Sequence, residues 1–362
     1  MKLVSVDKLE PGLVVSENIY TIDDRLVLPK GTILDAKDIE RIKAHSLYNI
    51  FVEDKKKAVP IKAHDSDPGV EPSYNEKLRK SEQFIKFKEH IEENAERLEE
   101  TFKMIVNGVV PLDVDKLIDP VYHLFVEAGG TAGIFDMLHN LRDNCDEVYM
   151  HSLNVSLISN TIAHWMKLSD EEIQLVTAGA LLHDIGKILV PQELLTKTTP
   201  LAHFEQSIVK QHVVKGYELV KDKNIDKRIK DCILMHHEMR DGSGYPLGLK
   251  GSKIDPLASI VVVANIYDDL TSKRLYRDSY SPFYVIENFE NEGLYKFDTN
   301  VIMTFLSNIV NTFLADRVLL STGQSGEIVF INPDHLSKPV VKCGDQFIDL
   351  SVKKEISIIS VV

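Results

Sequence analysis

The sequence predicts a mainly α-helical protein with a small β-rich unit at its N-terminus and a small β appendix at its C-terminus. Apolar residues recur mostly at three- and four-residue spacing from about residue 77 to residue 312, which is typical of helices packed on a core. Short apolar runs separated by Pro-Gly and Lys-Gly occupy the first 56 residues, and similar runs return after Leu320. A chain of 362 residues is expected to hold two or three domains.

The N-terminal unit, residues 1–56, is expected to contain four strands and one helix. Asp35 precedes the helical pattern of residues 36–44 and is a plausible N-cap. No residues here have catalytic spacing, so the unit is either a sensor or docking module or a domain that packs on the rest. The expected strands are residues 3–6, 12–15, 26–29 and 48–52.

Residues 57–112 are predicted to form a linker followed by a long helix. Pro60, Pro68 and Pro72 mark the linker. From Lys77 to about Val106 a single apolar stripe runs between many Glu and Lys residues. Such a helix needs a partner, which is either the helical body of the chain or the same helix in a second copy. We favour the second copy and therefore expect a homodimer.

Residues 113–320 are predicted to form one helical domain, and residues 321–362 a small β appendix that is structural. Ser169 followed by three acidic residues resembles a helix start. Asn332-Pro333 predicts a turn between strands of the appendix. The expected helices are residues 114–128, 132–145, 148–166, 170–182, 202–220, 226–237, 257–273 and 283–289.

Composition limits the possible partners and the location. The formal net charge of −13 argues against binding of a nucleic-acid polymer but allows a small anionic ligand in a locally basic pocket. The three cysteines, Cys145, Cys232 and Cys343, are far apart and suggest no disulfide framework. The first residues are too short an apolar run for a signal peptide, and no run is long enough to span a membrane. We therefore expect a cytoplasmic protein.

Histidines are the most informative residues of the helical domain. Of the 13 in the chain, five lie on apolar faces of predicted helices. Burying that many imidazoles is costly unless each is hydrogen-bonded or binds a metal. These five are His151, His183, His212, His236 and His237.

Carboxylates and a lysine accompany these histidines at helical spacing. Asp184 follows His183 directly, and Lys187 lies three residues after Asp184, so a helix would place them on neighbouring positions of one face. Glu147 lies four residues before His151 and would share its face. Imidazole and carboxylate together are a ligand set for divalent metals.

The consecutive pair His236-His237 cannot point the same way on a regular helix, so it should lie at a helix end. The loop-forming string that follows supports this, and the whole stretch reads HHEMRDGSGYPLGLKG. This string, together with the histidines before it, resembles the HD-GYP family, a branch of the HD superfamily of metal-dependent phosphohydrolases. The resemblance covers about residues 113–320.

The resemblance implies an HD-type helical bundle that holds two or three divalent metal ions, with iron the first expectation and manganese the next. It implies a hydrolase, a phosphodiesterase that converts cyclic di-GMP to pGpG, with either pGpG or GMP as the end product. Asp184 is the expected bridge between two metals, and Glu147 corresponds to an extra ligand found in part of the family. The implied metal ligands are Glu147, His151, His183, Asp184, His212, His236 and His237.

One position departs from the family pattern. The family usually has Asp as the final ligand in an Ala-Asp-x-x-Asp string, and this chain has Asn265 there. Asn265 can coordinate as a weaker, neutral ligand, and Asp268 lies three residues later and could substitute for it. Both are therefore candidate metal ligands.

The expected mechanism uses a hydroxide formed from a bridging water, which attacks phosphorus in line. Asp184 and Lys187 are the candidate catalytic residues, with Lys187 stabilising charge or protonating the leaving oxygen. Tyr245 is expected to stack on guanine or bind a phosphate, and two arginines are expected to bind phosphates. The candidate substrate-binding residues are Asp241, Gly244, Tyr245, Arg274 and Arg277.

Two alternatives remain open. The first is a cyclic di-GMP receptor with the same metal site but low turnover, and Asn265 is the best support for it. The second is an HD hydrolase that acts on another nucleotide, against which the GYP loop argues.

Overall fold

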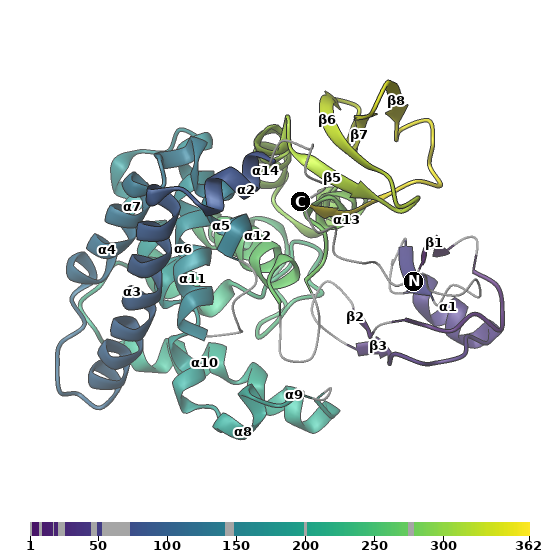
Figure 1. Cartoon of the computed structure of the whole chain (residues 1–362). Helices are drawn as coiled ribbons and strands as arrows, with labels where there is room; N and C mark the ends of the chain where they lie inside the picture. The colour runs from purple at the N-terminus through teal and green to yellow at the C-terminus, as the bar shows by residue number, and fades with distance from the viewer. Residues whose placement is uncertain are drawn as a thin grey trace. The chain divides into compact units, whose positions relative to one another are not determined.

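The computed structural model describes residues 2–6, 9–16, 18–20, 26–44, 49–52, 73–141, 148–198, 201–273 and 279–362 (Figure 1). Contacts divide the chain into two compact units. The first unit comprises Met1–Lys77, Ser281–Asn288 and Phe313–Val362, and the second comprises Leu78–Tyr280 and Phe289–Thr312. The predicted domain boundaries at residues 56, 112 and 320 remain predictions.

The N-terminal segment of the first unit folds around its own apolar core. The predicted N-cap is confirmed, since Asp35 accepts a hydrogen bond from the backbone N–H of Asp38 at 2.7 Å. Residues 12–15 do not form the predicted strand, because only Val14 and Val15 make isolated bridges, to Ile33 and Val52. The elements are β1 (Lys2–Ser5) paired antiparallel with β4 (Asn49–Val52), β2 (Ile19–Tyr20) paired antiparallel with β3 (Leu26–Leu28), and α1 (Ala36–Ala44).

The C-terminal β appendix is confirmed as a five-stranded antiparallel sheet in the order β8-β7-β6-β5-β9. Asn332 ends β6 and Asp334 donates its backbone N–H to the Asn332 side chain at 3.0 Å, which forms the predicted turn. Val318, Ile328 and Val341 are fully buried on its inner face. The strands are β5 (Arg317–Leu320), β6 (Ser325–Asn332), β7 (His335–Cys343), β8 (Gln346–Asp349) and β9 (Ile358–Val361).

The second unit is helical, which confirms the predicted mainly α fold class. The capping box at Ser169 and Glu172 starts α7 as predicted. The predicted helix at 202–220 is two helices, and α14 continues the helical region beyond the predicted helices. The helices are α3 (Glu82–Val106), α4 (Val114–Glu127), α5 (Ile134–Leu141), α6 (Val148–Trp165), α7 (Asp170–Leu182), α8 (Gln192–Leu195), α9 (His203–Lys210), α10 (His212–Val220), α11 (Lys227–Met235), α12 (Pro256–Thr271), α13 (Pro282–Lys296, which spans both units) and α14 (Thr299–Ile309).

Helices α6 and α12 form the centre of this unit. α6 contacts α3, α4, α5, α7, α12 and α14 (Figure 1). Most residues of both helices are buried, as expected for helices enclosed by others. Their polar side chains are therefore buried too, and these include His151 and Asp268. Among the described residues, none of the helices combines the length and apolar character that crossing a lipid bilayer requires.

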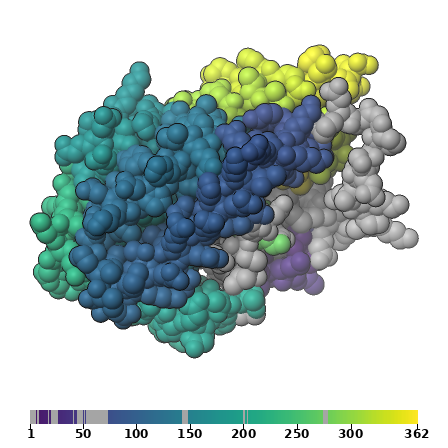
Figure 2. Space-filling view, turned by 60° about the vertical axis from the view of Figure 1, so that its left-hand side comes forward, coloured from purple at the N-terminus to yellow at the C-terminus, as the bar shows by residue number. Residues whose placement is uncertain are grey.

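The long helix begins later than expected. A short helix, α2 (Tyr74–Arg79), ends before Ser81, which caps α3 by accepting the backbone N–H of Phe84. The apolar stripe of α3 is buried against α4, α5 and α6, so it packs within the chain, which is one of the two expected arrangements. The opposite side of α3 lies on the surface (Figure 2).

Candidate metal centre

Five elements of the helical unit deliver the candidate ligands to one place. His151 projects from α6, and Asn265 and Asp268 project from α12. His212 is the first residue of α10. The remaining histidines lie at helix ends: His183 directly follows α7, and His236 directly follows α11, as the sequence predicted for the consecutive pair.

The His-Asp-x-x-Lys segment is not the continuous helix that the spacing suggested. α7 ends at Leu182, and Ile185–Leu189 form a 3₁₀ helix that follows Asp184. In a 3₁₀ helix residues three apart eclipse each other, so this geometry brings Lys187 closer to Asp184 than an α-helix would. The Lys187 Nζ lies 2.6 Å from the Asp184 Oδ2.

Gly186 lets this turn pack directly on α10. A Cβ at Gly186 would lie 2.0 Å from the carbonyl oxygen of His212 and 2.5 Å from the backbone nitrogen of Gly216. Any other residue would push the two segments apart. The glycine therefore allows His212 to approach Asp184, and the His212 Nε2 lies 3.1 Å from the Asp184 Oδ1.

The two oxygens of Asp184 face two different groups of ligands. Oδ1 faces His212 at 3.1 Å and His236 at 3.8 Å. Oδ2 faces His183 at 3.1 Å and His151 at 3.7 Å. The ligand atoms of His151, His183 and Asp184 lie within 4.8 Å of one another, and so do those of His212, His236 and His237. Asp184 thus lies between two potential ion-binding positions.

Three of the histidines are held in one tautomer by the backbone. The Nδ1 atoms of His183, His212 and His236 lie 2.6, 2.8 and 2.9 Å from the carbonyl oxygens three residues earlier. A carbonyl oxygen only accepts hydrogen bonds, so each Nδ1 carries the proton. The Nε2 of each neutral ring is then unprotonated, and its lone pair can bind a metal.

These lone pairs point at other acceptors. The Nε2 atoms of His212 and His236 are 3.2 Å apart, and the Nε2 of His183 and the Oδ1 of Asp184 are buried without a hydrogen-bond partner among the described residues. Buried acceptors that face one another are unfavourable unless a cation lies between them. The donor set therefore fits divalent metal ions.

His151 is held differently, by α12. Its Nδ1 lies 2.7 Å from the Asp268 Oδ2, and its Nε2 lies 2.9 Å from the Asn265 Oδ1. Asp268 also accepts a hydrogen bond from the Asn154 side chain at 3.1 Å. Asp268 thus contacts the outer nitrogen of the imidazole, whereas Asn265 lies on the side of the other ligands.

The loop that carries Gly244-Tyr245-Pro246 folds back on the His236-His237 turn. A Cβ at Gly244 would lie 2.3–2.5 Å from the backbone of His237, Glu238 and Met239. The Tyr245 ring stacks on His237 with ring centres 4.6 Å apart and an interplanar angle of 17°. The Lys210 Nζ lies 4.4 Å from the centre of the same ring. Asp241 accepts two hydrogen bonds from Ser243 and shapes the turn.

Three candidate residues, Glu147, Arg274 and Arg277, lie outside the described residues. Reasoning from sequence missed Glu238, Lys210 and Asn154. Glu238 follows the histidine pair, but nothing in the sequence distinguishes it from a surface glutamate, whereas the structure buries it to 1% exposure.

Charge states in the centre favour metal binding at neutral pH. Burial alone would raise the pKa of Asp184, but the Lys187 ammonium at 2.6 Å helps to hold that pKa well below its ordinary value. Burial holds the pKa of His236 well below its ordinary value. The carboxylate is therefore ionised and the imidazole neutral, as metal ligands must be.

This leads to a testable pH dependence of the metal-free protein. Unfolded histidine binds a proton below about pH 6.5, whereas folded His236 stays neutral. The unfolded state then binds more protons, so the free energy of unfolding should fall as pH decreases through that value. We expect the thermal midpoint to decrease between about pH 7.5 and pH 5.5, and less so in His236→Gln. A midpoint that rises toward acid pH would contradict this assignment.

Comparisons with known proteins agree with this site. The chain is 31% identical over 206 residues to cyclic di-GMP phosphodiesterase PA4108 of Pseudomonas aeruginosa, covering 57% of this chain and 50% of that protein. It is 39% identical over 129 residues to the cyclic di-GMP phosphodiesterase response regulator RpfG of Xanthomonas campestris, covering 35% and 34%. It is 29% identical over 150 residues to 3'3'-cGAMP-specific phosphodiesterase 2 of Vibrio cholerae, covering 41% and 29%. The chain thus spans half or less of the length of these relatives.

Residues 137–301 match the family model described as HD domain, and this range contains every described candidate ligand. The helical unit therefore contains a segment that is similar to HD domains. The predicted resemblance to the HD-GYP family is confirmed.

Proposed function

We propose that the chain is a metal-dependent phosphodiesterase that hydrolyses cyclic di-GMP to pGpG. The observation that carries this proposal is the position of Asp184 between two groups of imidazoles. Divalent ions held there would supply a hydroxide nucleophile at neutral pH and stabilise charge on the phosphoryl oxygens. The names of the relatives support a cyclic dinucleotide as the substrate.

The ligand set favours iron or manganese over magnesium, because imidazole nitrogens outnumber carboxylate oxygens. His151, His183 and Asp184 would hold one ion, and Asp184, His212, His236 and His237 would hold the other. Asn265 would complete the first position through its amide oxygen, since it lies 2.9 Å from the His151 Nε2. Asp268 would not bind the ion but would orient His151 through Nδ1. Glu147 stays a candidate ligand for a third ion.

Around this centre the other residues would bind and orient the substrate. Lys187 is 23% exposed at its side chain, so its ammonium group can reach both Asp184 and a phosphate or leaving oxygen. Tyr245 is engaged with His237, which supports a role in shaping the centre more than the stacking on guanine that the sequence suggested. Arg274 and Arg277 remain candidate phosphate ligands.

The test is hydrolysis by protein purified without oxygen and loaded with Fe²⁺ or Mn²⁺. Cyclic di-GMP and 3'3'-cGAMP should be compared as substrates, with products separated by chromatography. We expect pGpG to form from cyclic di-GMP only in the loaded protein. Tight binding of cyclic di-GMP with no product would contradict the proposal and favour the low-turnover receptor.

Asn265 gives a separate prediction. Asn265→Asp would replace a neutral ligand with a charged one beside His151. We expect the affinity for the first ion to rise about tenfold, the lower end of effects from groups around a metal site, and turnover to rise with it. Asn311→Asp adds the same charge at an exposed position of the same unit and serves as the control. Unchanged metal affinity in Asn265→Asp would show that residue 265 does not contact the ion.

The homodimer also remains a proposal. The buried stripe of α3 is used within the chain, so a second copy would bind the outer face, where Ile85 is 47% and Met104 39% exposed.

A further inference from the structure

We propose that Glu238 is a positioning residue for the second ion, which His212, His236 and His237 would hold with Asp184. The Glu238 carboxylate fixes the loop that holds the ring of His237. This inference rests on the proposed metal centre but not on the reaction or its substrate. It concerns a residue outside the expected ligand and substrate-binding sets.

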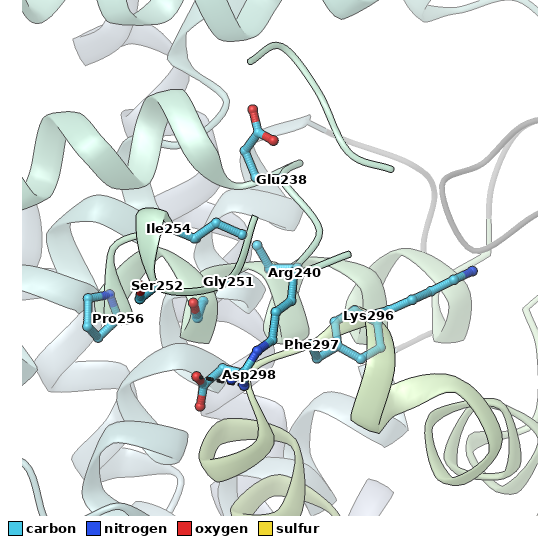
Figure 3. A pocket seen from close by; sticks show the side chains of 11 residues that line it. Glu238, Arg240, Gly251, Ser252, Ile254, Pro256, Lys296, Phe297 and Asp298 are labelled. Atoms are coloured by element: carbon cyan, nitrogen blue, oxygen red, sulfur yellow. Dashed lines mark hydrogen bonds and ion pairs between the residues drawn. The ribbon is translucent and has the colours of Figure 1, made fainter. Parts of the chain in front are cut away.

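The Glu238 carboxylate is buried. Among the described residues, its hydrogen-bond partners are backbone N–H groups of the loop. Its Oε1 accepts the backbone N–H of Leu247 at 2.6 Å, and its Oε2 accepts that of Leu249 at 2.8 Å. Figure 3 shows this carboxylate pointing away from Arg240, whose guanidinium extends toward Asp298 at 3.4 Å. Hydrogen bonds from two N–H groups to a buried carboxylate are strong, so they fix the loop directly after Pro246.

The fixed loop in turn controls the Tyr245 ring. The backbone N–H of Tyr245 donates to the His237 carbonyl oxygen at 3.1 Å, and Gly244 packs directly on the backbone of His237, Glu238 and Met239. The loop is therefore attached at two points, to His237 through Tyr245 and to Glu238 through Leu247 and Leu249. Between these points the Tyr245 ring stacks on the His237 imidazole.

The orientation of the His237 ring depends on this stacking, whereas the rings of the other histidine ligands are oriented by hydrogen bonds. His183, His212 and His236 are each oriented by a backbone carbonyl, and His151 is oriented by Asp268. The imidazole of His237 makes no hydrogen bond to any described residue. Its orientation is therefore set by ring packing, in which Tyr245 is the nearly parallel partner at 17°. A loosened loop would let this ring turn away from the second ion.

The test is to titrate the metal-free protein with Mn²⁺ in the absence of substrate. The number of bound ions and the affinity of each site are measured. Glu238→Gln keeps the volume of the side chain but places an NH₂ group against one of the two loop N–H groups. One of the two hydrogen bonds to the loop is therefore lost. We expect one of the two Mn²⁺ sites to lose about 10- to 100-fold in affinity while the other is unchanged. Arg240→Gln, which changes a neighbouring side chain that does not bind the loop, should leave both affinities unchanged.

Two variants of Tyr245 keep the test decisive if Glu238→Gln does not fold. Tyr245→Phe keeps the stacked ring and should keep both sites, whereas Tyr245→Ala removes the ring and should weaken the same single site. Two sites of wild-type affinity in Tyr245→Ala, or in folded Glu238→Gln, would overturn the inference. Because no substrate is used, that result would leave the proposed hydrolysis standing, and a failed hydrolysis assay would leave this inference standing.

Discussion

Asp184→Asn should lose both bound ions and essentially all of the proposed phosphodiesterase activity. The substitution keeps the shape of the side chain but removes the charge that both ligand groups share. It also places an NH₂ group where one of the carboxylate oxygens faces His183 or His212. We expect the rate of cyclic di-GMP hydrolysis to fall roughly a thousandfold or more, the upper range for loss of a preorganised charged group.

The measurement is metal content by elemental analysis together with the initial rate. Asp231→Asn is the matched control, because Asp231 is also a buried aspartate of the same unit but pairs with Lys227. It should keep both ions. An Asp184→Asn protein that holds two ions and remains active would show that Asp184 does not bridge them.

Lys187→Ala should have the second-largest effect, and it should be an effect on turnover alone. The Lys187 ammonium lies 2.6 Å from Asp184, but no imidazole depends on it for orientation among the described contacts. Removing a general acid or a charge-stabilising group typically lowers the rate by about 10²–10⁴-fold. We therefore expect kcat to fall in that range while both ions remain bound.

Lys215→Ala is the matched control for this lysine. Lys215 lies on neighbouring α10 and donates to the carbonyl oxygen of Leu189 at 3.1 Å, away from the ligands. It should retain wild-type kcat. If Lys187→Ala turns over substrate at the wild-type rate, Lys187 has no part in the reaction, and if it loses its ions its role is structural.

Much of the architecture follows from local sequence patterns. The capping residues Ser169 and Asp35 start their helices as predicted, because a side-chain oxygen next to free backbone N–H groups is a local property. The helix end at His236 was also predictable, because consecutive ligands and a DGSG turn exclude a continuing helix. The strand predicted at residues 12–15 failed because pairing depends on a partner, and Val14 and Val15 find only single bridges.

Details of the site depend on contacts between distant segments, which spacing cannot reveal. The sequence left open whether Asn265 or Asp268 supplies the last ligand, and their different contacts with His151 on α6 distinguish them. The spacing of Asp184 and Lys187 fitted an α-helix, whereas the close approach of α10 at Gly186 accompanies a 3₁₀ turn. Glu238 was missed because its partners are backbone N–H groups, which carry no sequence signal.

The most direct test of the metal centre is elemental analysis of the full chain purified without oxygen and loaded with Fe²⁺ or Mn²⁺. The two ligand groups that share Asp184 predict at least two tightly bound ions per chain in the native sequence. Loss of one histidine from each group, His183→Gln and His212→Gln, should reduce the count by one ion or more. Fewer than one ion per chain in correctly folded native protein would contradict the account.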